Sequence, residues 1–144
     1  MTTHTGYPGI VDDELLPLVE PLDYEEAVDT FCGAGGASAG LAAAGLRVIG
    51  FDHWDQAIRT HNLNGHRAHV WDLSSAPPPI KRCSILWGSP PCQPYSSAGD
   101  GEGDDDQRDG IPWWLDCVRQ MRPHVAIMEN VKGLTFAKFK HVLE

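Results

Sequence analysis

Short apolar runs alternate with small-residue turns and helix-prone segments along most of the chain. Short apolar runs bounded by turn residues favour buried strands, and the longer segments between them favour helices. The pattern predicts five strands at residues 27–31, 48–51, 69–71, 84–87 and 125–128, and three helices at 37–44, 56–62 and 113–121.

This alternation is typical of an α/β fold, in which helices cover both faces of one parallel sheet. Residues 1–25 contain proline, glycine and acidic residues with weak periodicity, so we expect an N-terminal arm there and a single domain part over 26–144. Ligands of such sheets bind at the carboxyl ends of the strands. Four polar residues fall at those ends and give the first indication of a site: Asp52, Asp72, Cys92 and Glu129.

Composition excludes several classes of protein. The 144 residues, 42% of them apolar, are enough for the core of one domain. No apolar run approaches the roughly 20 residues of a membrane span. The N-terminus also lacks the pattern of a signal peptide, so we expect a cytoplasmic protein. The four cysteines show no CxxC pair, so we expect free thiols and no metal site.

The charge of the chain argues against the simplest kind of DNA binding. The net charge is −9, whereas proteins that bind DNA non-specifically are usually basic because they neutralise phosphates. Residues 100–109 alone hold six acidic residues against Arg108. A basic surface would therefore have to come from folding or from a partner.

A glycine-rich turn directly follows the first predicted strand, in the sequence from Asp29 to Gly36. Glycines allow a tight turn and let a ligand approach backbone N–H groups. Ser38 stands where the dinucleotide fingerprint has its third glycine, so a nucleoside without a pyrophosphate fits better. The alternative for so short a motif is an ordinary packing turn.

Asp52 and Trp54 follow the second predicted strand. Asp52 lies 23 residues after Asp29, near the spacing at which an acidic residue binds ribose hydroxyls. The indole of Trp54 is a candidate for stacking on adenine. The alternatives are an acid at a helix N-terminus and an aromatic residue of the core, and Asp72 by itself indicates less.

Cys92 follows two prolines at the end of the fourth predicted strand. The prolines make a rigid turn that fixes the direction of the thiol, which favours a nucleophile. The other cysteines suit buried structural roles: Cys32, Cys83 and Cys117. Glu129 closes the fifth predicted strand, where a carboxyl group either donates a proton or caps a helix.

These motifs together resemble the DNA cytosine-5 methyltransferases over about residues 26–140. The chain has them in the family's order: Asp29-x-Phe31-x-Gly33-x-Gly35-Gly36, Asp52-x-Trp54, Asp72, Pro90-Pro91-Cys92-Gln93 and Glu129-Asn130-Val131. The resemblance implies a Rossmann-like fold that uses S-adenosylmethionine, with about five of the family's seven strands in this chain. It also implies a cofactor pocket made by Phe31, Gly33, Gly35, Gly36, Asp52, Trp54, Asp72 and Pro90.

The same resemblance implies methyl transfer to C5 of a cytosine in double-stranded DNA. Cys92 would add to C6 as the nucleophile, Glu129 would engage N3, and Arg108 matches an arginine of the family's mobile catalytic loop. The target base must leave the stack to reach such a pocket. The implied setting is a prokaryotic or phage-encoded restriction–modification system.

Three parts of the family pattern cannot be placed in this sequence: an arginine-bearing strand motif, the target-recognition domain and the last helix of the cofactor pocket. We expect a second polypeptide or a missing C-terminal half to supply them. The acidic segment is a second departure, because the corresponding loop closes over DNA and negative charge there repels phosphate. Two other hypotheses stay open: a non-catalytic interaction module of methyltransferase-like fold, and a tRNA cytosine-5 methyltransferase.

Overall fold

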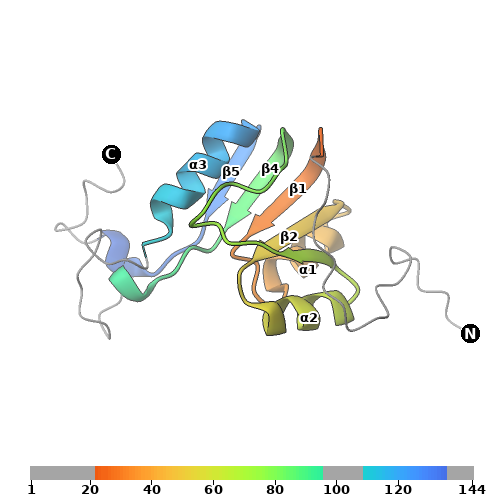
Figure 1. The fold of residues 1–144 in the computed structure, drawn as a ribbon, viewed down its shortest axis with the longest axis horizontal. Coiled ribbons are helices and arrows are strands. Elements are labelled where there is room, and N and C mark those ends of the chain that lie inside the picture. Colours follow the sequence, from red (N-terminus) through yellow and green to blue (C-terminus); the bar gives the residue numbers. More distant parts are fainter. Residues whose placement is uncertain (1–21, 96–108, 136–144) are drawn as a thin grey trace, which may run out of the picture.

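The computed structural model describes residues 22–95 and 109–135, which form a five-stranded parallel sheet with three helices (Figure 1). The strands are β1 (Glu25–Thr30), β2 (Val48–Asp52), β3 (Arg67–Val70), β4 (Cys83–Gly88) and β5 (Val125–Met128). The helices are α1 (Gly36–Ala43), α2 (Asp55–Leu63) and α3 (Ile111–Met121), and short 3₁₀ helices cover Gln93–Tyr95 and Lys132–Thr135.

The strands lie in the order β3-β2-β1-β4-β5, so the direction of winding reverses at β1. Thr30 at the end of β1 pairs with Phe51 of β2 on one side and with Gly88 of β4 on the other. The segments that leave β1, β2 and β4 therefore emerge next to one another. In parallel α/β sheets this reversal is where ligands bind.

Helices cover both faces of the sheet. Successive strand residues point to opposite faces, and the packing follows that alternation. Ile49 and Phe51 of β2 belong to the core under α3, which includes Trp114 and Met121. Gly50 between them faces the opposite side, where α2 packs. Figure 1 shows α3 beside β4, and α1 and α2 beside β2, in agreement with their contacts.

The predicted fold class is confirmed, and all five strands and three helices are present within two residues of the expected bounds. The first and third predicted strands each end one residue early. The pattern predicts Phe31 as the last residue of the first strand, but its φ of 58° lies in the left-handed region and β1 ends at Thr30. The turn thus begins at the aromatic residue, before the glycines.

Strand β5 is one of the two edges of the described sheet, β3 being the other, and its first three side chains are exposed. Val125 is 49% exposed and Ile127 is 37% exposed, whereas β1 and β2 are almost wholly buried. Parallel strands normally have both faces covered. Over the described residues, no helix is both long enough and apolar enough to cross a membrane.

Candidate functional site

The glycine turn, residues 31–36, joins β1 to α1 with three left-handed residues. Phe31, Gly33 and Gly35 have φ values of 58°, 49° and 98°. Gly35 precedes α1 directly, and its φ is one that glycine adopts without steric cost. At Gly33 and Gly36 no described atom lies within 4 Å of where a Cβ would be, so the backbone there is open to a ligand.

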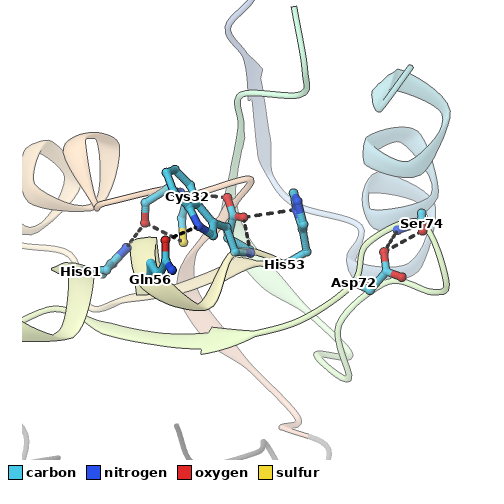
Figure 2. Close-up of polar contacts among 9 residues, drawn as sticks. Cys32, His53, Gln56, His61, Asp72 and Ser74 are labelled. Atoms are coloured by element: carbon cyan, nitrogen blue, oxygen red, sulfur yellow. Dashed lines mark hydrogen bonds and ion pairs between the residues drawn. The ribbon is translucent and has the colours of Figure 1, made fainter. Parts of the chain in front are cut away.

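Asp52, at the end of β2, holds this turn in place. The backbone N–H of Gly33 donates to its Oδ2 at 3.0 Å, and that of Trp54 donates to its Oδ1 at 2.9 Å. The His53 ring nitrogen Nδ1 lies 3.4 Å from the same Oδ1 (Figure 2). Asp52 is only 9% exposed. One buried carboxylate thus connects the glycine turn to the start of α2.

Trp54 is not part of the core. It is 57% exposed, and its indole N–H donates to Oε1 of Gln56 on the first turn of α2. The alternative of a core aromatic is therefore wrong. An exposed indole beside a buried carboxylate offers a flat apolar face that a planar base can cover.

Asp72 follows β3 and is exposed, and serines of its own loop bind its carboxylate (Figure 2). The backbone N–H and hydroxyl of Ser74 donate to Oδ1 at 2.9 and 2.6 Å, and the Ser75 hydroxyl donates to Oδ2 at 2.9 Å. These hydrogen bonds hold the pKa of Asp72 below its usual value. The group is thus an ionised acceptor near neutral pH.

Asp29 is the one fully buried carboxyl group of the glycine-turn region. Its Oδ2 accepts a hydrogen bond from the Ser38 hydroxyl at 2.7 Å, and its Oδ1 has no partner among the described residues. Burial raises its pKa from 3.8 to about 6, and the Ser38 bond opposes that rise. The sequence identified Ser38 as a missing glycine, but its role as the partner of Asp29 depends on the fold.

The Cys92 loop, residues 89–95, leaves the end of β4. Pro90 is buried and Cys92 is half-buried, and the backbone N–H of Tyr95 donates to the Cys92 carbonyl at 3.0 Å to close the short 3₁₀ helix. The other three cysteines are buried, as expected. Burial raises the pKa of Cys83 and of Cys117 to about 12, and it also raises that of Cys32. Those three thiols are therefore poor nucleophiles.

Glu129 leaves β5 next to the Cys92 loop, and two hydrogen bonds join the segments. The Glu129 N–H donates to the Gly88 carbonyl at 2.9 Å, and the Asn130 side-chain amide donates to the Pro90 carbonyl at 3.2 Å. The Glu129 side chain itself is exposed. The sequence marked Asn130 only as part of a motif, whereas its link to Pro90 requires two strands to be neighbours.

The structure brings most of the predicted residues together at the carboxyl ends of the parallel strands. The Ser89 N–H donates to the Thr30 carbonyl at 3.3 Å, so the Cys92 loop begins beside the glycine turn. At Gly110 a Cβ would lie 2.7 Å from Pro91 and 3.1 Å from Phe31, so the N-terminus of α3 packs on both segments. Asp72 stands farther along the edge, after β3. Arg108 and residues 100–108 of the acidic segment lie outside the described residues.

Comparison with known proteins agrees with this geometry. A family model described as "C-5 cytosine-specific DNA methylase" matches residues 26–144. The type II methyltransferase M.AplI of Arthrospira platensis is 34% identical over 110 residues, covering 76% of this chain and 32% of that protein. M.NaeI of Lentzea aerocolonigenes is 33% identical, and the match covers 83% of this chain and 32% of that protein. M.HgiGI of Herpetosiphon aurantiacus is 31% identical, and the match covers 78% of this chain and 95% of that protein.

The chain spans about a third of the length of M.AplI and of M.NaeI. Among solved structures, a TehB-like SAM-dependent methyltransferase from Corynebacterium glutamicum gives a TM-score of 0.57 at 20% identity, with 85% of this chain and 64% of that chain covered. The S. pombe Dnmt2 methyltransferase gives a TM-score of 0.55 at 21% identity, and the match covers 84% of this chain and 39% of that chain. Similarity at this level establishes the fold.

Proposed function

Because the chain belongs to the C-5 cytosine-specific DNA methylase family, we propose that it is the cofactor- and nucleophile-bearing part of a DNA cytosine-5 methyltransferase. One arrangement carries the proposal. The Cys92 loop and the Glu129 segment leave neighbouring strands and are joined through Asn130, beside the glycine turn. A base at Cys92 and a methyl donor at the glycine turn would then meet at the carboxyl ends of the central strands.

The cofactor of this family is S-adenosylmethionine, and the residues at the glycine turn fit it. The open backbone at Gly33 and Gly36 admits a ligand. The Asp52 carboxylate can accept further hydrogen bonds, since each oxygen has two lone pairs, and this suits ribose hydroxyls. The exposed indole of Trp54 suits adenine, and the ionised Asp72 suits its amino group. We assign the pocket to Phe31, Gly33, Gly35, Gly36, Asp52, Trp54, Asp72 and Pro90.

At the target base the chain's own residues provide nucleophile and acid. The Cys92 thiolate adds to C6 of cytosine while Glu129 gives a proton or hydrogen bond to N3, so that C5 gains enamine character. S-adenosylmethionine, when bound, supplies the methyl group that C5 takes. Loss of the C5 proton to a base from solvent then breaks the C6–S bond and releases Cys92. We assign Arg108 to the catalytic loop above the base.

The DNA-reading surface is proposed to lie on a second polypeptide or C-terminal half. Three observations support this. The apolar side chains Val125 and Ile127 on β5 are exposed, and the chain corresponds to about a third of M.AplI. The net charge of −9 is also unfavourable for holding phosphates without a basic partner.

The experiment is a covalent-trapping assay with duplex DNA that carries 5-fluorocytosine, in which fluorine blocks loss of the C5 substituent. The 144-residue chain is mixed with S-adenosylmethionine and with the C-terminal part of a relative such as M.AplI. We expect a DNA adduct with the unmodified chain and with Cys117→Ser, and none with Cys92→Ser. An adduct on Cys92→Ser would refute the assignment of the nucleophile. No cofactor binding and no adduct with any chain would favour the non-catalytic module.

A further inference from the structure

His61 lies on α2 and is fully buried, in a space that two glycines leave open. A Cβ at Gly35 would stand 3.1 Å from the His61 ring, and a Cβ at Gly50 would stand 2.7 Å from its Cε1 atom. Gly35 belongs to the glycine turn and Gly50 to the middle of β2. The imidazole therefore lies between the turn and the sheet.

One polar contact orients this ring. Its Nδ1 lies 3.2 Å from the Gly33 carbonyl oxygen (Figure 2). A carbonyl only accepts, so Nδ1 must carry the proton and Nε2 has the free lone pair of the neutral ring. Nε2 is buried without a partner among the described residues. Burial also lowers the pKa of His61, in keeping with a neutral imidazole.

The two peptide groups that flank Gly33 are thus held by side chains from outside the turn. Asp52 of β2 accepts from the Gly33 N–H at 3.0 Å, and His61 of α2 donates to the Gly33 carbonyl. Apart from its chain neighbours, no atom lies within 4 Å of a Cβ built at Gly33, and the other polar contact of its carbonyl is the weak one from the Cys32 thiol at 3.8 Å. The hydrogen bonds with Asp52 and His61 are therefore the ones that tie Gly33 to β2 and α2.

We propose that His61 is a positioning residue of the cofactor site: its Nδ1–H fixes the Gly33 carbonyl and so presets the glycine turn to receive the nucleoside. This inference rests on the proposed cofactor site at that turn. Gly50 gives independent support. Glycine is unfavourable inside a strand, and here the missing side chain is what makes room for the His61 ring and the Cys32 sulfur, 2.7 and 2.8 Å from a Cβ.

Three variants of the full chain test this assignment. His61→Asn keeps an N–H donor near the position of Nδ1, whereas His61→Phe keeps a ring of similar size and removes the donor. His124→Asn, at an exposed histidine before β5, is the matched control. Isothermal titration with S-adenosylhomocysteine is expected to show affinity about fivefold to tenfold weaker for His61→Phe. It should be unchanged for His124→Asn and largely restored in His61→Asn.

A second measurement needs no cofactor. Long-range ¹H–¹⁵N correlation of the imidazoles in the free chain is expected to show His61 with its proton on Nδ1, and amide exchange of residues 33–36 should speed up in His61→Phe but not in His61→Asn. An Nε2–H tautomer, or equal exchange in all variants, would overturn the inference. If the unmodified chain binds no S-adenosylhomocysteine, the proposed cofactor site fails, while the tautomer and exchange data still decide the role of His61.

Discussion

The glycine turn and the Cys92 loop stand next to each other but differ in how they are held. Around the turn, buried groups from three elements converge: Asp52 from β2, Ser38 from α1 and His61 from α2. Around the loop, Cys92 is half-buried, Glu129 is exposed, and the neighbouring strand β5 is an uncovered edge. The glycine turn is thus held by buried groups of this chain, whereas the Cys92 loop adjoins exposed side chains and the exposed strand β5.

The largest expected effect comes from overfilling the glycine-turn side. Gly50→Val should lower the free energy of unfolding by about 3–4 kcal/mol, because the new side chain overlaps the His61 ring and the Cys32 sulfur. Denaturant unfolding followed by circular dichroism measures this change. Gly40→Ala is the control, since a Cβ there meets nothing within 4 Å and alanine is favoured in a helix. Equal stability of both variants would contradict the packing of His61.

The second effect is a pH dependence centred on Asp29. Burial raises its pKa to about 6 from 3.8, so the folded state favours the protonated form. The associated stability is complete below about pH 4 and is lost as pH rises through 6, a change of about 3 kcal/mol. Asp29→Asn should remove this part of the pH profile, as measured by unfolding from pH 4 to pH 8. An unchanged profile would show that Asp29 is already ionised in the folded chain.

On the Cys92 side, Asn130 offers a smaller and more local test. Asn130→Ala removes the hydrogen bond to the Pro90 carbonyl and the one that Oδ1 accepts from the Val131 N–H, and should cost about 1–2 kcal/mol. Faster amide exchange is expected in residues 89–95 and 129–131, with the glycine turn unaffected. Asn64→Ala at the exposed end of α2 is the control. If exchange at the turn rises as much as at the Cys92 loop, the two regions are not held independently.

The smallest effect on stability is expected at Trp54. Since the indole is 57% exposed, Trp54→Ala should change the free energy of unfolding by less than about 0.5 kcal/mol. It should nevertheless weaken binding of S-adenosylhomocysteine by about fivefold to tenfold, because an aromatic face contributes about 1 kcal/mol. Titration and thermal unfolding of the same sample separate the two. A large loss of stability with unchanged affinity would assign Trp54 to packing.

The sequence predicted the fold and much of the candidate site because both are encoded locally. Apolar runs and turn residues are adjacent in the chain, so five strands and three helices could be placed from their pattern. The residues at strand ends, from Asp52 to Glu129, followed from the same reasoning. The left-handed Phe31 escaped prediction, since its backbone is imposed by the turn that follows and not by an intrinsic preference.

What only the tertiary structure decided are the partners of these residues. Ser38 beside Asp29 joins two consecutive elements across the glycine turn, whereas His61 beside Gly33 and Asn130 beside Pro90 join segments that are far apart in the chain. Such pairs depend on the order of strands and on which face each side chain meets. By itself the sequence determined which chemical groups the chain carries and at which strand ends they stand. The fold decided which of them are buried, exposed or hydrogen-bonded, because burial and hydrogen bonding are properties of neighbours in space.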